Sequence, residues 1–412
     1  MRILLPILLV SLALQAQPRV QPFVLPNGLR VFHLEDHEHP LVRARLHLDL
    51  TPADTQAGLE GLSALALRMF QASGSVEGKA DDFDQLLEGS GIQLTRAATP
   101  TGLAWQVVAR SRDQDRALGL LAENLLRTVF DPATLWRQAA ACWQDQEPLG
   151  ASPQVRLRRV LAVAPGERPT QASLSAINLE DLIAFRGRVF RPERAVLVLH
   201  GDLGLEQAKR LVLLNLGSWV GPALPAAKVA ARPPAAPEVP VRLPAPGTSL
   251  TLQAVAPPPP ELAPEVLALL DLLVPGDPLL PPVRVTLEGC GLVATLEPGP
   301  DTAAPQALAT LHGHLAALGQ RGYTQLELDR ARGAWLARRS LDSLHPETLL
   351  AVALAEAQAR GAMPGPMKAL TLEALNAGLR SWLDPKRLRT GAAGPPEALA
   401  QLAPPPPDPT TK

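Results

Sequence analysis

The densest group of potential metal ligands in the sequence lies between residues 33 and 39, where histidines are interspersed with carboxylates. Imidazole nitrogens and carboxylate oxygens are donors that zinc and other transition ions take from proteins. The group falls at the end of an alternating segment, Arg30 to Leu34, and on the polar turn that follows it. Neighbouring side chains on a strand point to opposite faces, so these residues should diverge. The pattern favours a solvated hairpin tip over a metal site. The residues concerned are His33, Glu35, Asp36, His37, Glu38 and His39.

Other residues that could do chemistry are scattered. His312 and His314 lie two apart in a predicted helix, which directs them away from each other and predicts surface positions. Cys142 and Cys290 lie in different halves of the chain, and two separate buried thiols are favoured over a disulfide. No HExxH, Walker, dinucleotide-binding or nucleophile-elbow pattern occurs. The sequence therefore offers no familiar catalytic motif of these kinds.

Length and composition suit two domains. The chain has 412 residues, 46% of them apolar and only 3% aromatic, so aliphatic side chains must supply most of the core. A net charge of -1 provides no long-range attraction to nucleic acid or to anionic membranes. Prolines gather in residues 221–260 and 403–409, which predicts a linker and a tail.

The first residues have the pattern of a secretory signal peptide. A single positive charge at Arg2 is followed by an apolar run, Ile3 to Leu14, and by a small residue at Ala16. The alternative is an apolar first strand. The run is too short for a stable membrane anchor, and no cysteine follows it that could carry a lipid. We expect residues 1–17 to be removed by cleavage near Ala16 and the protein to be secreted or periplasmic.

The order of predicted elements repeats once along the chain. In the first half, Asn178 can cap a helix that leads through Arg191-Pro192 into a buried apolar strand ending at Gly201. In the second half, residues 370–375 and 383–388 mirror that unit. The repetition predicts two tandem α+β domains at residues 18–220 and 247–400, joined by a Pro/Ala-rich linker at 221–246 and followed by a disordered tail at 401–412.

Several segments, in order, resemble the pitrilysin/insulinase family of zinc peptidases. They are Leu25-Pro26-Asn27-Gly28-Leu29, the helix from Gly58 to Phe70, Leu179-Glu180-Asp181-Leu182, and Phe190 to Val196 with the following Gly201-Asp202. The resemblance extends over nearly all of residues 20–395. It implies two tandem homologous domains of the insulinase (LuxS/processing-peptidase-like) type, each a mostly antiparallel sheet packed with helices. The two domains would face each other as a clamshell around a chamber.

In this family the helix at Gly58–Phe70 carries the inverted zinc motif, in which two histidines bind the ion and a glutamate polarises the bound water. The corresponding positions here are Ala64, Leu67 and Arg68. The family's third ligand, a glutamate from a later helix, falls within residues 143–146, with Gln144 as the best match. Alanine and leucine offer no donor atom, and a guanidinium repels a dication. The resemblance therefore implies a degenerate site without zinc or another cofactor.

The second domain is degenerate by the same comparison. In active members it presents an arginine and a tyrosine near the substrate carbonyl. The segment Gly291-Leu292-Val293-Ala294 places Ala294 at the tyrosine position and Pro281 at the arginine position, with Arg284 as the alternative.

Three functions remain open from the sequence. The first is an exported, non-catalytic subunit that pairs with an active homologue and holds an extended peptide by β-augmentation. The second is a stand-alone peptide-binding or scaffold protein, including a self-associating one. The third is an active zinc metallopeptidase with non-standard ligands. The missing arginine–tyrosine pair counts against the first. Arg68 either pairs with a carboxylate in the chamber or is an ordinary exposed helix residue.

Overall fold

The computed structural model describes residues 20–51, 54, 58–74, 80–99, 102–146, 152–162, 169–221, 240–245, 249–259, 262–288, 291–342 and 370–402. The predicted signal peptide, most of the predicted linker, Cys290 and the tail from residue 403 onward lie outside these ranges. Among the described helices, none has the length and apolar character needed to cross a membrane.

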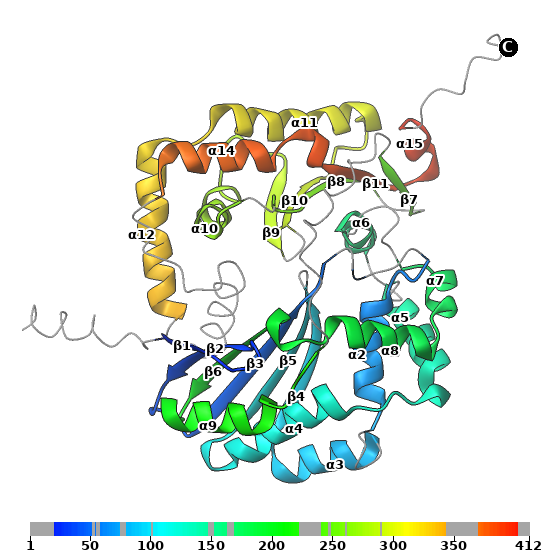
Figure 1. The fold of residues 1–412 in the computed structure, drawn as a ribbon. Coiled ribbons are helices and arrows are strands. Elements are labelled where there is room, and N and C mark those ends of the chain that lie inside the picture. The colour runs from blue at the N-terminus through cyan, green and yellow to red at the C-terminus, as the bar shows by residue number, and fades with distance from the viewer. Residues whose placement is uncertain are drawn as a thin grey trace, which may run out of the picture.

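Two β-sheets form the two halves of the molecule (Figure 1). The first has the order β1-β2-β6-β3-β5-β4, and only the β2–β6 pair is parallel. Its strands are β1 (Val20–Val24), β2 (Arg30–Glu35), β3 (Leu41–Asp49), β4 (Gln93–Thr99), β5 (Gly102–Arg110) and β6 (Ala195–Gly201).

The second sheet has the order β7-β11-β8-β10-β9, and only the β7–β11 pair is parallel. Its strands are β7 (Val241–Pro244), β8 (Thr251–Ala256), β9 (Arg284–Glu288), β10 (Gly291–Leu296) and β11 (Arg389–Gly394). The predicted α+β class with mostly antiparallel sheets is confirmed.

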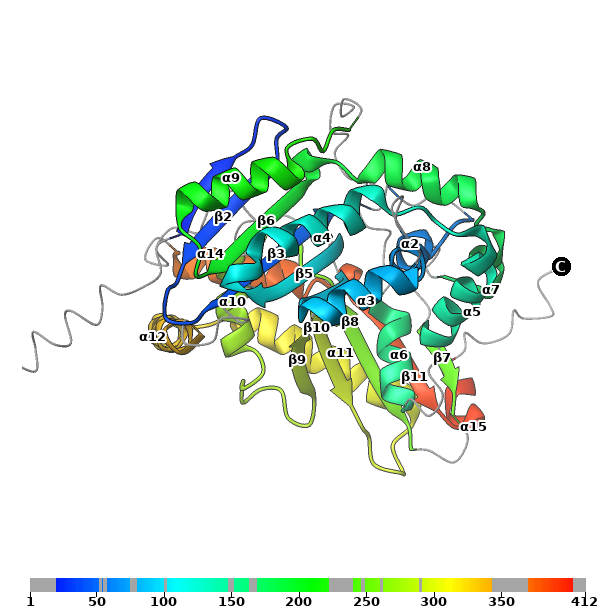
Figure 2. The ribbon, with the colours of Figure 1, turned by 90° about the horizontal axis from the view of Figure 1, so that it is seen from below.

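Helices cover the outer side of each sheet, so the inner faces are turned toward each other (Figures 1 and 2). The first half carries α2 (Leu62–Ala72), α3 (Ala80–Ser90), α4 (Gln114–Arg127), α5 (Leu135–Gln146), α6 (Pro153–Ala162), α7 (Gln171–Ala176), α8 (Leu179–Val189) and α9 (Leu205–Leu216). The second carries α10 (Pro264–Leu273), α11 (Ala304–Arg321), α12 (Gln325–Asp342), α14 (Leu372–Trp382) and α15 (Pro396–Ala400). Short 3₁₀ helices lie at Ser111–Asp113, Pro132–Thr134, Pro192–Arg194 and Pro385–Arg387.

An aromatic cluster fixes α2 on the first sheet. The ring of Phe70 lies 5.5 Å from that of Trp105 in an edge-to-face arrangement and stacks on Phe190 at 4.9 Å. Leu65 and Met69, on the same side of the helix, are fully buried. Because i, i+4 and i+5 positions of a helix share one side, this packing decides which residues of α2 face away from the sheet.

Helix α6 belongs to the first half by sequence but packs on the inner face of the second sheet. Leu157 and Leu161 form a buried cluster with Val255, Val293 and Ala393 from β8, β10 and β11. A side chain at Gly391 would place its Cβ 2.8 Å from Leu157 Cδ1 of α6 and 2.9 Å from the Val241 carbonyl oxygen of β7, so glycine leaves room here for both neighbours. The Arg389 guanidinium donates to the Ala162 carbonyl at 3.0 Å, at the end of α6.

A buried ion pair anchors the segment that precedes α2. Arg194 Nη1 donates to Asp54 Oδ1 at 2.9 Å, and the two side chains are 15% and 8% exposed. Burial alone would raise the pKa of Asp54, but the hydrogen bonds from Arg194 and Thr51 outweigh it and the pKa is lowered. The pair therefore stabilises the fold above the unfolded-state pKa of about 4 and loses that contribution as the pH falls through the lower folded-state pKa.

We predict that Asp54→Asn lowers the free energy of unfolding at pH 7 by about 3–5 kcal/mol, because it leaves the buried Arg194 charge unpaired. The difference from wild type should shrink as the pH is lowered below about 4. Urea denaturation at pH 7 and pH 3 measures both values. The control is Asp113→Asn, which breaks the exposed pair with Arg110 and should cost less than about 1 kcal/mol. Equal losses in the two variants at pH 7 would contradict the assignment.

Candidate degenerate zinc site

The start of α2 is held against α7. Gly61 precedes the helix with a φ of 95°, a conformation that glycine adopts without strain. A Cβ at this position would lie 2.7 Å from Leu174 Cδ2 in α7. The close approach of these two segments, together with the aromatic cluster, sets the rotation of α2 about its axis. The residues that face α5 follow from that rotation.

Arg68 forms an ion pair with Asp145 in the last turn of α5. The Arg68 side chain is 26% exposed and the Asp145 side chain 62% exposed. A pair with this much solvent contact is worth no more than about 1 kcal/mol. Arg159 of α6 donates to the backbone carbonyl of Asp145 at 2.7 Å, so α2, α5 and α6 meet at this residue. Of the two interpretations of Arg68, the structure supports the carboxylate-paired one.

The other two motif positions present carbon only. Leu67 is buried and Ala64 is half-buried against the core of the first half. Cys142, one turn before Asp145, is a free buried thiol. Its pKa is raised, chiefly by burial and further by the Asp145 charge, while the Arg68 charge opposes the shift. A protonated thiol is neither a nucleophile nor a metal ligand at neutral pH. The residues at this site therefore do not fit a zinc ion.

At the predicted third-ligand position, the structure distinguishes two neighbouring residues of α5. Gln144 is exposed. Among the described residues it is the adjacent Asp145, and not Gln144, that forms the ion pair with Arg68. Successive residues of a helix are rotated by about 100°, so a shift of one position turns the side chain away from α2. Asp145, which also lies in the predicted range 143–146, is therefore the residue of α5 that faces Arg68. A carboxylate at position 145 was the available signal.

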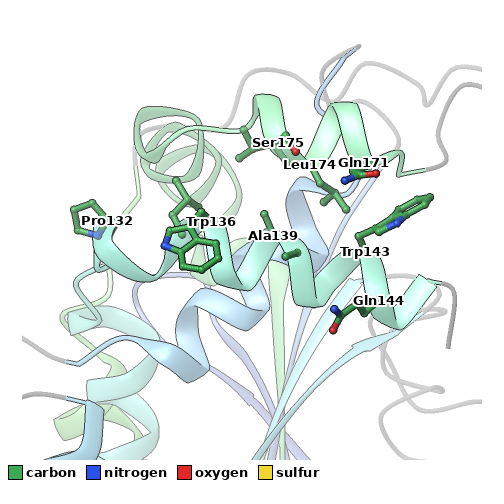
Figure 3. Close-up of a pocket in the computed structure, with 11 residues that line it drawn as sticks. Pro132, Trp136, Ala139, Trp143, Gln144, Gln171, Leu174 and Ser175 are labelled. Atoms are coloured by element: carbon green, nitrogen blue, oxygen red, sulfur yellow. The ribbon is translucent and has the colours of Figure 1, made fainter. Parts of the chain in front are cut away.

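Gln144 instead lines a pocket between α5 and α7, where Figure 3 shows its side chain near that of Trp143. The pocket has a volume of about 440 Å³. Trp136, at the other end of α5, is 73% exposed beside it. The lining contains no ionisable side chain, being formed by Pro132, Leu135, Trp136, Ala139, Ala140, Trp143, Gln144, Gln171, Leu174, Ser175 and Ile177.

In the second sheet, Ala294, the residue at the predicted tyrosine position, faces the outer helices. It is fully buried in the core beneath the outer helices, so a side chain at this position points away from the first sheet. The alternation along β10 turns Val293 and Thr295 to the inner face. Arg284 is exposed and lies opposite Thr295 in the register, on the same face. Of the two arginine candidates, Arg284 rather than the turn residue Pro281 has an inner-face strand position.

His33 and His37 point to different partners, but Asp36, Glu38 and His39 converge, contrary to the expectation that side chains at residues 33–39 diverge. His37 Nδ1 lies 2.7 Å from Asp202 Oδ1 and its Nε2 lies 2.8 Å from Glu35 Oε1, which raises the pKa of His37. His33 is buried, with Nε2 2.7 Å from the Leu203 carbonyl. The converging group is Asp36, Glu38 and His39, and His200 from the end of β6 lies beside Asp36. His200 was missed because only the β2–β6 pairing brings it to this turn.

His312 is exposed, as predicted. His314 is half-buried, and its Nδ1 lies 2.7 Å from the Leu279 carbonyl. No other described ligand group joins them in a metal-binding cluster.

Solved structures share this architecture. A protease from Helicobacter pylori superimposes with a TM-score of 0.70 at 14% identity, covering 92% of this chain and 100% of its own. The chain has the fold of M16 peptidases. An M16 peptidase inactive domain from Pseudomonas fluorescens gives a TM-score of 0.68 at 20% identity, covering 92% of this chain and 98% of its own. The periplasmic protease PqqL from Escherichia coli gives 0.69 at 15% identity, covering 92% of this chain and 46% of its own.

A family model supports the same assignment over part of the sequence. Residues 176–274 match the model of the M16 peptidase inactive domain, from α8 in the first half to α10 in the second. No curated protein matches the chain. M16 is another name for the pitrilysin/insulinase family, so the predicted resemblance and the two-domain α+β fold are confirmed.

The position of the third ligand can be tested by rebuilding the motif. We predict that Ala64→His, Leu67→Glu and Arg68→His, combined with Asp145→Glu, create a zinc site, because a glutamate then reaches the two new histidines from α5. The same triple variant combined with Gln144→Glu should bind zinc more weakly by at least about tenfold, since the carboxylate points away. Calorimetric titration of both folded variants with Zn²⁺ gives the comparison. Tighter binding by the Gln144→Glu version would restore the original placement.

Proposed function

We propose that this protein is an exported, non-catalytic M16 homologue that pairs with an active M16 subunit and forms part of a chamber that holds an extended peptide. The observation that carries the proposal is the Arg68–Asp145 ion pair, which joins α2 and α5, the helices that the resemblance assigns to the zinc motif and to the third ligand. A fixed cation with its own counter-charge leaves neither a ligand nor a site for a dication. The match to the inactive-domain model supports the same conclusion.

The edge of the first sheet supports peptide binding. Strand β4 pairs only with β5 within the described residues, and it contacts α2. Its residues alternate between exposed and half-buried along most of its length. An edge strand offers unpaired backbone donors and acceptors that an extended peptide can complete. A peptide added at β4 would run beside the degenerate site, where it could be held without being cleaved.

Export is supported by the sequence pattern of residues 1–17 and by the likeness to the periplasmic protease PqqL. A signal peptide would deliver the chain to the compartment in which that relative acts. The proposed partner must then be exported as well, and it would carry the intact His-x-x-Glu-His motif.

A second candidate is a stand-alone peptide-binding or scaffold protein. It is favoured by the orientation of Ala294, because the second sheet then presents no tyrosine-like group to the inner face at that position. A supporting half of an active peptidase would be expected to keep such a group. The two candidates differ in whether a catalytic partner is bound.

We predict that the chain, isolated from its native host by a cleavable affinity tag, co-purifies with an M16 homologue that contains the zinc motif. Size-exclusion chromatography with mass spectrometry measures the partner and its stoichiometry. The same material should lack residues 1–17 and should come from the extracytoplasmic fraction. Recovery of this chain alone, as a monomer or homodimer, would favour the scaffold function. Cleavage of peptides by the isolated chain, abolished by a chelator, would overturn the non-catalytic assignment.

A further inference from the structure

Two turns at one end of the first sheet are locked together by backbone hydrogen bonds. Asp36 N donates to the Gly201 carbonyl at 3.0 Å, and Asp202 N donates to the Leu41 carbonyl at 3.0 Å. Gly201 has a φ of 128°, and a Cβ there would lie 2.0 Å from the Leu41 carbonyl oxygen, so no other residue permits this approach. The β2–β3 turn and the end of β6 are therefore held in one fixed arrangement before any ligand binds.

This arrangement gathers three potential metal ligands into one cluster and places a fourth beside one of them. The donor atoms of Asp36, Glu38 and His39 all lie within 4.8 Å of one another. His200, from β6, is only 3% exposed, and its Nε2 lies 3.4 Å from Asp36 Oδ2. His39 Nδ1 lies 3.9 Å from the same oxygen. Asp36 Oδ2 thus lies within 3.9 Å of two imidazoles that come from different segments of the chain.

The Asp36 carboxylate is also oriented by the backbone. Its other oxygen, Oδ1, accepts a hydrogen bond from Glu38 N at 2.9 Å, which turns Oδ2 toward the two histidines. Hydrogen bonds that orient a ligating carboxylate are characteristic of protein metal sites. The buried His200 adds a ligand whose position is fixed by the sheet and does not depend on the exposed turn.

The distances suit a tetrahedral transition ion. Zinc binds nitrogen and carboxylate oxygen at about 2.0–2.2 Å, so two ligands of one tetrahedral ion lie about 3.3–3.6 Å apart. The 3.4 Å separation of Asp36 Oδ2 and His200 Nε2 already has this value, and the side chains of Glu38 and His39 are exposed and free to turn toward the same ion. Two imidazoles and two carboxylates form a donor set typical of Zn²⁺, and they would neutralise its charge.

We propose that Asp36, Glu38, His39 and His200 form a binding site for a divalent transition ion of the zinc type. The site is distinct from the degenerate zinc helix, since none of its residues belongs to α2 or α5. The bound ion would join the β2–β3 turn to the end of β6. It follows that the protein has lost one metal position at α2 while it offers another at the opposite end of the first sheet's strands.

The experiment uses the full, tag-free chain after treatment with EDTA and buffer exchange. Titration with ZnCl₂ by calorimetry should give one ion per chain with a Kd tighter than about 10 µM. Co²⁺ should give the visible d–d absorption of a tetrahedral nitrogen–oxygen site, and Zn²⁺ should raise the Tm because it binds only the folded state. Binding weaker than this by the wild-type chain would overturn the proposal.

Matched variants locate the ion. His39→Ala and Asp36→Asn should each weaken Zn²⁺ binding by more than about 100-fold, since loss of even an outer-shell partner costs about 10–100-fold. The control is His37→Ala. The two histidines lie in one turn and are similarly exposed, at 61% for the His37 side chain and 60% for that of His39. They differ because His37 is paired with Glu35 and Asp202 and is not a proposed ligand. Unchanged binding by His37→Ala supports the site. An equal loss in His37→Ala, or no loss in His39→Ala and Asp36→Asn, would overturn it.

Discussion

The burial of one side of α2 is the constraint on which the rest of the first half depends. Leu62, Leu65, Met69 and Phe70 are each at most 1% exposed, and each buried side chain of this size contributes about 1.5–3 kcal/mol. The Arg68–Asp145 pair on the other side of the helix contributes no more than about 1 kcal/mol. The fold is therefore stabilised by residues of α2 other than those at the positions of the family's zinc motif. The first half can therefore keep this fold although Ala64, Leu67 and Arg68 offer no zinc ligand.

This separation of the packing residues from the motif positions explains which features the sequence revealed. The fold class and the tandem arrangement followed from apolar runs, from the Asn178 cap and from the Arg191-Pro192 unit, because burial acts on every element. In the structure Asn178 indeed accepts a hydrogen bond from Asp181 N at 3.0 Å and begins α8. The loss of the motif was equally visible, since Ala64 and Leu67 carry no donor atoms whatever their surroundings.

Side-chain direction was less accessible from the sequence. Spacing limited the third-ligand position to residues 143–146, with Gln144 as the best match. It could not show that Asp145 is the residue that pairs with Arg68, because a single residue changes which way a helical side chain points. The face of β10 on which Ala294 lies could not be read from spacing either, because a shift of one position in a strand exchanges the two faces. The convergence of His200 on Asp36 could not be found by spacing at all, because it depends on a parallel pairing between strands far apart in the sequence.

The placement of α6 has a consequence for how the two halves can exist. A chain cut within the proline-rich region after residue 221 would leave one fragment with Leu157 and Leu161 facing water, and the other with Val255, Val293 and Ala393 uncovered. Each fragment would expose an apolar surface that fits the apolar surface of the other, and the two fragments would tend to reassociate or to aggregate. The two halves are thus linked through α6, which comes from the first half in sequence and packs on the sheet of the second. An autonomous second half would have to include α6.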